Sequence, residues 1–158
     1  MSRVLIINNT PYNYPTAGDE PGWGGQATDW AEAVTNVLAE LLGPNDILET
    51  AFNIANNQTS AADITGLFFN AASVRAANIT YSVYRISNTN LSGNAETGTI
   101  QLIYDNVIGW SINQGNILGS SGVTFSITVV GQLQYTSTNI GSLGYSGTMK
   151  FRAKCLNQ

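Results

Sequence analysis

The sequence contains no histidine and only one cysteine, Cys155, among its 158 residues. The absence of histidine removes the commonest metal ligand and the commonest general base together. A single cysteine excludes an internal disulfide framework, and we interpret Cys155 as a small apolar residue near the C-terminus. We therefore predict a chain that uses no metal, no cofactor and no disulfide.

Charged side chains are also scarce, at 10% of the chain against a typical ~25%. Six basic residues against ten acidic ones give a net charge of −4, whereas binding to a phosphate backbone requires clustered Lys and Arg. Nucleic-acid binding is therefore not predicted. The apolar run at residues 4–7 is shorter than the ~7–15 residues of a signal-peptide core and the ~20 of a membrane span. We expect neither a secretion signal nor membrane association.

The sequence offers few groups for catalysis. Without histidine, a Ser, Thr or Cys nucleophile has only Lys150, Lys154 or a carboxylate as its base, and no Ser-x-x-Lys arrangement or nucleophile elbow is present. Carboxylates such as Asp19, Asp46 and Asp105 form a glycosidase pair only at the right separation, and no sequence feature places two of them together. We predict a protein that is not an enzyme and has no catalytic residues.

One segment, residues 26–42, has a sustained helical period. Its apolar residues recur at spacings of four, three and four, which places on one stripe Trp30, Val34, Val37 and Leu41. A helix of about four turns is marginal alone in water. The stripe therefore requires a partner, which is the chain's own β-domain, copies of the same helix, or a larger particle.

Both ends of this helix are marked in the sequence. Gly24-Gly25 precedes it, and Gly43-Pro44 ends it by supplying a left-handed cap and a residue that cannot continue the helix. The acidic Asp29 and Glu32 are expected early in the helix, where the positive end of the dipole favours them.

An N-terminal hairpin is predicted over residues 4–15, with a turn at Asn8-Asn9 that tolerates positive φ. The Gly- and Pro-rich residues 16–25 form a loop that contains Trp23. This tryptophan either anchors the hairpin, loop and helix together with Trp30, or acts as a docking anchor for a partner.

From Ile47 onward the hydrophobic pattern alternates as in β-strands. Eight candidate strands are separated by turns rich in Gly, Asn and Ser, at residues 47–55, 64–69, 74–86, 97–105, 109–112, 123–128, 132–138 and 145–154. Short strands at regular spacing are typical of an antiparallel sandwich. We therefore predict a mainly β protein in two parts. Residues 1–46 form a hairpin, a Gly/Pro loop and one amphipathic α-helix for attachment or oligomerisation, and residues 47–158 form a jelly-roll-like antiparallel β-sandwich.

The longest strand, residues 74–86, is expected in the centre of a sheet. Its apolar face, with Ile79 and Val83, is closed at the two ends by Arg75 and Arg85. The alternation also predicts a tight hairpin between the strands at 123–128 and 132–138.

The last strand sorts its side chains sharply, because residues 149, 151, 153 and 155 are apolar while Lys150, Arg152 and Lys154 share the other face. These three are half of the six basic residues. We interpret the strand as a sheet edge or a solvent face on which Lys blocks unwanted pairing. The alternative is a basic strip that contacts an acidic neighbour in an assembly.

A β-sandwich can also bind sugars through exposed aromatic rings. Trp110 is the candidate glycan contact, and Tyr84 and Tyr104 are further aromatic residues in predicted strands. In strands with this alternation, burial in the core is the better explanation for each of them taken singly.

Several short motifs extend over nearly the whole chain. The N-terminal ones are Ile7-Asn8-Asn9-Thr10-Pro11-Tyr12-Asn13-Tyr14-Pro15, Gly18-Asp19-Glu20, Gly22-Trp23-Gly24 and Thr28-Asp29-Trp30. They resemble an N-terminal module of virion structural proteins of tailed bacteriophages. The downstream ones are Asp46-Ile47-Leu48-Glu49-Thr50, Val74-Arg75-Ala76-Ala77, Tyr81-Ser82-Val83-Tyr84-Arg85 and Gln132-Leu133-Gln134-Tyr135. They resemble β-rich domains of phage fibre and head-decoration proteins.

This resemblance implies a non-enzymatic virion structural protein, assembled in the host bacterial cytoplasm. On that expectation the chain is a capsid decoration or short fibre subunit, of the head or the tail, that self-associates as a homotrimer and docks on capsid or tail components. The residues expected to mediate oligomerisation or docking are Trp23, Trp30, Val34, Val37 and Leu41. The alternative is a glycan- or receptor-binding β-sandwich of a tail fibre, which contacts a host-surface glycan through Trp110.

Overall fold

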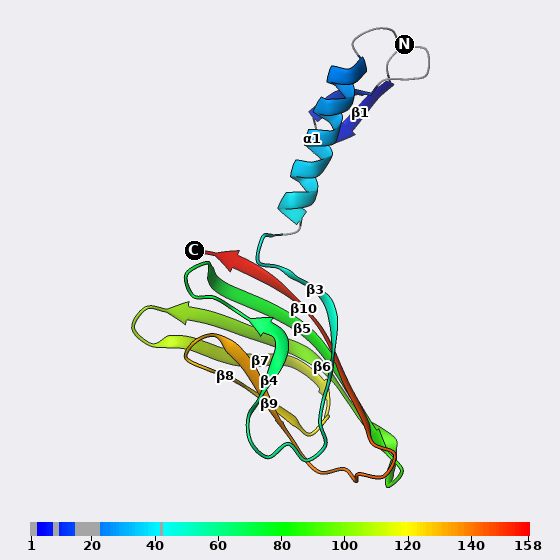
Figure 1. Ribbon diagram of the computed structural model, residues 1–158, viewed down its shortest axis with the longest axis vertical. Coiled ribbons are helices and arrows are strands. Elements are labelled where there is room, and N and C mark those ends of the chain that lie inside the picture. The colour runs from blue at the N-terminus through cyan, green and yellow to red at the C-terminus, as the bar shows by residue number, and fades with distance from the viewer. Residues whose placement is uncertain (1–2, 8–9, 15–22, 42) are drawn as a thin grey trace. The chain divides into compact units, whose positions relative to one another are not determined.

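The computed structural model describes residues 3–7, 10–14, 23–41 and 43–158 of the chain. The chain divides into two compact units, Met1–Pro44 and Asn45–Gln158 (Figure 1). The division falls slightly before the boundary expected after Asp46. Asp46 belongs to the second unit, since its Oδ1 accepts a hydrogen bond from the backbone N–H of Cys155 at 2.7 Å.

The N-terminal unit consists of a hairpin and one helix. β1 (Arg3–Ile7) pairs antiparallel with β2 (Thr10–Tyr14), and α1 (Trp23–Leu41) contacts both strands. The structure therefore confirms the predicted hairpin and the predicted helix. The turn expected at Asn8-Asn9, the last residue of the predicted hairpin and residues 16–22 of the predicted loop lie outside the described residues.

The helix begins at Trp23, earlier than the sequence predicts. Gly24 and Gly25 were expected before the helix but lie in its first turn, where backbone N–H groups have no intrahelical partner in any case. Asp29 and Glu32 consequently lie beyond the first turn, which holds no acidic residue. The prediction that the helix dipole favours these two residues is wrong, because the effect falls off within the first turn.

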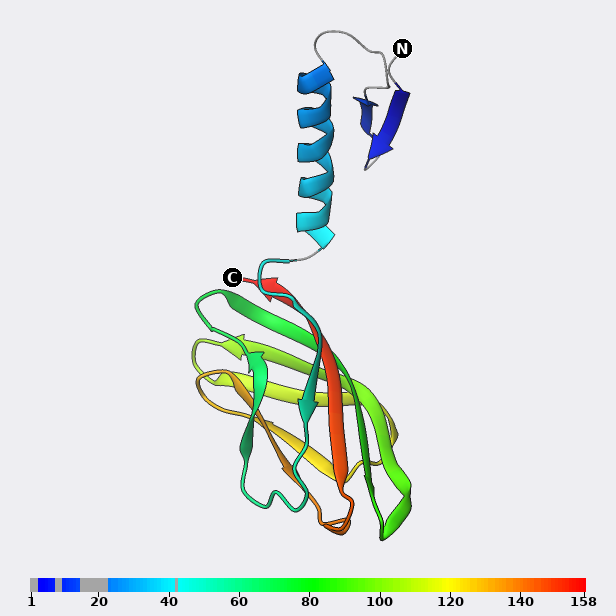
Figure 2. The same ribbon diagram turned by 45° about the vertical axis from the view of Figure 1, so that its right-hand side comes forward.

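The second unit is built from eight strands, as predicted. They are β3 (Ile47–Asn53), β4 (Ala62–Phe68), β5 (Val74–Ser87), β6 (Asn90–Asp105), β7 (Gly109–Gly119), β8 (Val123–Ile127), β9 (Gln132–Ser137) and β10 (Ser146–Asn157). The larger sheet has the strand order β3-β10-β5-β6-β7, and the smaller sheet has the order β4-β9-β8. Figure 2 shows the two sheets as separate layers, and all the pairings are antiparallel. The predicted antiparallel β-sandwich with one helix is confirmed.

The strand order settles two of the sequence predictions. β5 is the middle strand of the larger sheet, so its central position is confirmed. β10 lies between β3 and β5, so the sheet-edge alternative is wrong. The solvent-face alternative is confirmed, because Lys150, Arg152 and Lys154 are all exposed. On an interior strand these residues cannot block pairing at an edge.

Two strands are longer than the sequence predicts. β6 begins at Asn90 rather than at residue 97, and β7 continues past residue 112. The turn-forming residues of these segments are paired in the sheet, with Asn94 opposite Arg85 and Gly115 opposite Thr99. Ladder hydrogen bonding to a long neighbouring strand therefore overrides the local turn preference of Asn and Gly.

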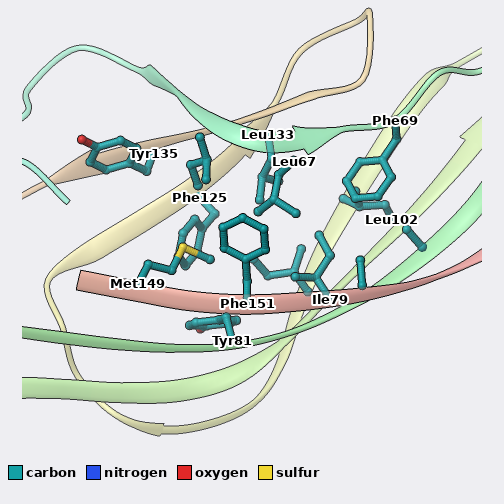
Figure 3. Packing of buried hydrophobic residues seen from close by; sticks show 14 of the residues in the cluster. Leu67, Phe69, Ile79, Tyr81, Leu102, Phe125, Leu133, Tyr135, Met149 and Phe151 are labelled. Carbon is teal, nitrogen blue, oxygen red and sulfur yellow. The ribbon is translucent and has the colours of Figure 1, made fainter. Parts of the chain in front are cut away.

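The core lies between the two sheets and takes side chains from both of them (Figure 3). The predicted β8-β9 hairpin places Phe125 opposite Tyr135, and both rings point inward. The Phe125 ring also meets the edge of the Tyr81 ring, with centroids 5.0 Å apart. Among the most deeply buried members are Ile64, Leu67, Phe69, Ile79, Ile100, Leu133, Met149 and Phe151.

One end of the core is closed by Arg85, which is fully buried on β5. Its guanidinium donates hydrogen bonds to the Ser121 carbonyl oxygen at 2.7 Å and to Asn56 Oδ1 at 3.2 Å. It also donates to the Tyr145 hydroxyl at 3.2 Å and to the carbonyl oxygen of Thr138. These partners lie in the β3-β4, β7-β8 and β9-β10 connections. Arg85 thus ties three connections between the sheets to the central strand.

Candidate functional site

The predicted docking stripe lies on α1. Trp30, Val34 and Val37 are each partly buried, as expected for one shared helical face. The side chains of Trp23 and Leu41, the other two predicted members, are outside the described part of the structure. Among the residues of this unit whose burial is described, Ala33 is the buried hydrophobic one. The hairpin therefore covers the stripe only in part.

The N-terminal unit also carries apolar side chains on its surface. On β1, Val4 is 58% exposed and Ile6 is 73% exposed, and on α1 Leu38 is 51% exposed. Alternate residues of a strand point to the same face, so Val4 and Ile6 form one apolar strip. A two-stranded hairpin is marginal by itself and needs packing against a further element. This unit therefore exposes apolar side chains on both of its elements.

A second candidate surface is the outward face of the larger sheet, which is hollowed along its length. Three hollows of about 560, 340 and 580 Å³ follow one another along β5 and its neighbours. The last two hollows share Ser82, Thr97 and Lys150. We call this surface the sheet groove, and its floor consists of Asn78, Thr80, Ser82, Thr97 and Gln101.

The floor of the sheet groove carries short polar side chains, but most of the surface that lines the two larger hollows is apolar and includes Ile103, Leu118 and Leu156. Asn78 lies opposite Gln101, and Ser82 lies opposite Thr97, in the pairing of β5 with β6. All of these side chains are exposed, since they alternate with the buried residues of the same strands. The backbone groups beneath them are engaged in the sheet ladders. The groove therefore offers hydroxyl and amide groups to a ligand.

The basic residues of β10 form one rim of the sheet groove. Lys150 Nζ lies 3.7 Å from Glu49 Oε1, and Lys154 Nζ lies 2.6 Å from Asp46 Oδ2. Arg152 lies between them in the middle hollow. Within the described part of the chain no ion pair is found for Arg152. It is the cation of this rim that is available to an acidic ligand.

Trp110, the predicted glycan contact, is in the core and only 8% exposed. Its ring packs against Tyr104 at a centroid distance of 5.3 Å and against Phe69 at 6.3 Å. Stacking on a sugar requires an accessible ring face, which this position does not provide. We therefore do not retain Trp110 as a glycan contact.

Tyr84 is the aromatic residue that lies in the sheet groove, and it is 50% exposed. Its ring rests against Gly93, where an added Cβ would lie only 2.9 Å from the ring. Gly93 has a φ of 68°, a left-handed conformation that favours glycine. The absence of a side chain at this position lets the Tyr84 ring lie against the backbone while its other side faces solvent.

The perturbed titratable groups of the sandwich have structural roles. Burial, and then the Asp46 carboxylate, raise the pKa of Cys155 to about 11, and its thiol donates a hydrogen bond to the Asn45 carbonyl oxygen at 3.0 Å. A protonated thiol is a poor nucleophile. Burial also raises the pKa of Tyr81, whose hydroxyl donates to Glu96 Oε1 at 2.7 Å.

Two further searches of the described residues gave no site. No group of three or more His, Cys, Asp or Glu side chains is placed to hold a metal ion in the part of the chain that the structure describes. Among the described residues, no helix combines the length and the apolar character that crossing a membrane requires.

Comparison with known proteins gives limited information. No family model matches the chain, and no curated protein matches it in sequence. The crystal structure of the Acinetobacter phage vB_ApiP_P1 tailspike protein aligns with a TM-score of 0.45 and 14% sequence identity. The alignment covers 72% of this chain and 22% of the tailspike chain. We draw no functional conclusion from a likeness of this size.

Proposed function

We propose that this chain is a non-enzymatic structural protein of a bacteriophage virion, a capsid decoration or short fibre subunit. It self-associates through the N-terminal unit, as a trimer, docks on a capsid or tail component, and displays the β-sandwich. The motif resemblance supports the virion role. The structural observation that carries self-association is the uncovered apolar surface of the N-terminal unit.

This surface combines the partly buried stripe of α1 with exposed side chains on both elements. Trp30, Val34 and Val37 retain accessible area, and Ile6 and Leu38 are more than half exposed. Full burial of one Val, Leu or Ile side chain is worth about 1.5–3 kcal/mol. Association of several copies through this surface buries several such side chains, so its favourable free energy exceeds that of any one of them.

The β-sandwich supports a display role because it has a complete core of its own. Every residue of its hydrophobic cluster belongs to the second unit. A domain with a self-contained core can be carried on an attachment unit without depending on it for stability.

The experiment that tests self-association is the native mass of the full chain by light scattering at several concentrations. We expect a concentration-independent trimer. Val37→Asp places a charge on the stripe and should dissociate the trimer while the β-sheet circular dichroism stays unchanged. Asn36→Asp is the matched control, because Asn36 is the exposed neighbour on the same helix, and it should leave the trimer intact.

Two results would contradict self-association. A monomer at every concentration would show that α1 has no partner copy. Joint loss of the trimer and of the β-sheet signal in Val37→Asp would show that this helix contributes to the stability of the sandwich.

A displayed β-sandwich can also contact the host surface, and glycan binding is the second candidate function. The middle hollow of the sheet groove favours it, because Thr80, Ser82 and Arg152 offer polar groups there. Trp110 takes no part in that surface.

A further inference from the structure

We infer that the β-sandwiches of an assembled trimer contact one another through an apolar row on the larger sheet, so that the partner of this surface is a second copy of the chain. The apolar row consists of Leu156 on β10, Ala76 on β5 and Ile103 on β6. This inference rests on the proposed self-association. It is carried by the strand register, the exposure of the row and the short connection to α1.

The strand register brings the members of the apolar row together. Leu156 lies opposite Ala76 in the pairing of β10 with β5, and Ala76 lies opposite Ile103 in the pairing of β5 with β6. Side chains directly opposite one another in neighbouring strands lie on the same face of a sheet. The small Ala76 between two longer side chains leaves a depression, which accounts for the hollow of about 560 Å³ that these residues line.

The apolar row is accessible to a partner. Leu156 is 70% exposed and Ile103 is 55% exposed. The turn that joins β6 to β7 lies at the same end of the sheet and adds Val107 and Ile108, which are 93% and 79% exposed. Asp105 Oδ1 fixes this turn by accepting hydrogen bonds from the N–H groups of Val107 and Ile108 at 2.7 and 2.9 Å. Single exposed apolar residues are ordinary, whereas adjoining ones around a hollow mark a place where another molecule binds.

Polar side chains border the apolar row on the sheet. The neighbouring row places Lys154 opposite Asn78, Asn78 opposite Gln101, and Gln101 opposite Asn113. An apolar centre with a polar rim is the usual anatomy of an interface between folded proteins. A peptide strand would instead need unpaired backbone groups at a sheet edge, and the backbone of β5 is paired on both sides. The surface therefore fits a folded partner.

The point at which the chain enters the β-sandwich adjoins the apolar row. Asn45 Nδ2 donates a hydrogen bond to Asn157 Oδ1 at 2.7 Å, and the N–H of Cys155 donates one to Asp46 Oδ1 at 2.7 Å. These two contacts flank Leu156 along β10. Whatever the chain holds near its entry point is therefore also near the apolar row.

The short connection to α1 selects a second copy as that partner. α1 ends at Leu41, and Asn45 follows four residues later, a length that spans at most about 14 Å. In a cyclic trimer the copies of α1 point in the same direction. Because packed helices lie about 8–10 Å apart, the three entry points are held within roughly 40 Å of one another. Tethering raises the effective concentration of one β-sandwich for the next, so a contact too weak to form between free β-sandwiches forms in the trimer.

The test is the rate of subunit exchange of the full chain. Isotopically labelled and unlabelled trimers are mixed, and native mass spectrometry follows the formation of mixed trimers. Leu156→Asp places a charge in the apolar row and should speed exchange at least about tenfold, because interface changes act mainly on dissociation. Leu143→Asp is the matched control, since Leu143 is also 70% exposed but lies in the β9-β10 connection, and it should exchange as the unchanged chain does.

A second pair of variants tests another member of the apolar row. Ile103→Asp should speed exchange as Leu156→Asp does. Ile117→Asp is its control, because Ile117 is 51% exposed and does not line this hollow, and it should leave the rate unchanged. Leu156→Met keeps an apolar side chain and should also exchange slowly. The unfolding midpoint in urea should be the same in the row variants as in their controls.

The outcomes separate this inference from the function on which it rests. A monomer of the unchanged chain in light scattering would overturn self-association and this inference together. A trimer that exchanges at the same rate in Leu156→Asp and Leu143→Asp would overturn the inference alone and leave the apolar row to another protein of the particle. Faster exchange with a lower urea midpoint in both Leu156→Asp and Ile103→Asp would also overturn it, because loss of folding would then explain the exchange.

Discussion

The two units of this chain differ in how completely they bury their apolar side chains. The β-sandwich closes a core between two sheets, with Leu133 and Met149 completely buried. The N-terminal unit has a single helix and a hairpin, and it leaves Ile6 and Leu38 exposed. A closed core makes a unit stable by itself, whereas an open apolar face makes it depend on a partner. This difference is the basis of the proposal that the N-terminal unit assembles and the β-sandwich is displayed.

The start of the sandwich is fixed firmly to its last strand. Asn45 Nδ2 donates a hydrogen bond to Asn157 Oδ1 at 2.7 Å, and the Asn45 carbonyl oxygen accepts one from the Cys155 thiol. Asp46 adds its ion pair with Lys154. The first two residues of the sandwich unit are therefore held against β10.

The largest effect is expected from opening the closed core. Phe151 is a buried residue of β10 whose ring lies in the core between the two sheets. Phe151→Ala should lower the free energy of unfolding by about 3–5 kcal/mol, measured by urea denaturation. Phe68→Ala is the matched control, because Phe68 is 55% exposed, and it should cost much less. The oligomeric mass should not change in either variant. Dissociation of Phe151→Ala under native conditions would break the distinction between the two units.

A smaller effect is expected at the end of the core that Arg85 closes. Arg85→Met keeps much of the side-chain volume but leaves the carbonyl oxygens of Ser121 and Thr138 without this donor. Ser121 is buried and its carbonyl oxygen is left unsatisfied, whereas the Thr138 carbonyl oxygen keeps the Asn57 N–H as a donor. An unsatisfied buried group costs about 1–3 kcal/mol, and we expect a loss of this size in urea denaturation. Arg75→Met, at an exposed position of the same strand, should change stability by less than about 0.5 kcal/mol. If Arg85→Met is as stable as the unchanged chain, the desolvation free energy of the buried guanidinium equals the stabilisation from its hydrogen bonds.

The smallest effect concerns the attachment point and depends on pH. Burial and Asp46 raise the pKa of Cys155 from 9.0 to about 11, so the folded chain holds the thiol proton more tightly than the unfolded chain. The contribution to stability is complete below pH 9 and is lost as the pH rises through about 11. The rate of alkylation by iodoacetamide should reach half its maximum near pH 11 in the folded chain and near pH 9 in urea. Coincident profiles would show that the thiol is not protected by the fold.

Cys155→Ser provides the control for this pH dependence. Serine retains a donor toward the Asn45 carbonyl oxygen but does not titrate in this range. The stability difference between the unchanged chain and Cys155→Ser should therefore shrink or change sign between pH 9 and pH 11. A constant difference would assign the alkaline loss of stability to other groups.

Much of the fold was predictable because it follows from local periodicity. The alternation of apolar and polar residues predicts all eight strands of the sandwich and the inward face of the β8-β9 hairpin. It also predicts which residues of β5 face the core, from Ile79 to Val83. The boundaries of β6 and β7 are less accurate, because pairing with a neighbouring strand extends them and is not visible in the local sequence. The start of α1 is less accurate because glycine is tolerated in the first turn of a helix.

The candidate surfaces show the same limit. The helical spacing identifies the stripe with Val34 and Val37, but the sequence does not show how much of it the hairpin covers. Trp110 was considered an exposed aromatic residue because strand alternation alone does not tell a core face from a solvent face. The sheet groove was not predicted at all, since it forms only where β10 lies beside β5, and these two strands are far apart in sequence.

The sequence by itself determined the composition, the absence of histidine, the strand and helix periods and the apolar stripe, because each of these is a property of neighbouring residues. Only the tertiary structure decided that β10 is an interior strand, that Arg85 is buried among three loops, and that Arg152 lies in a hollow of the larger sheet. These outcomes depend on strand order and on the packing of distant segments, which no local pattern encodes.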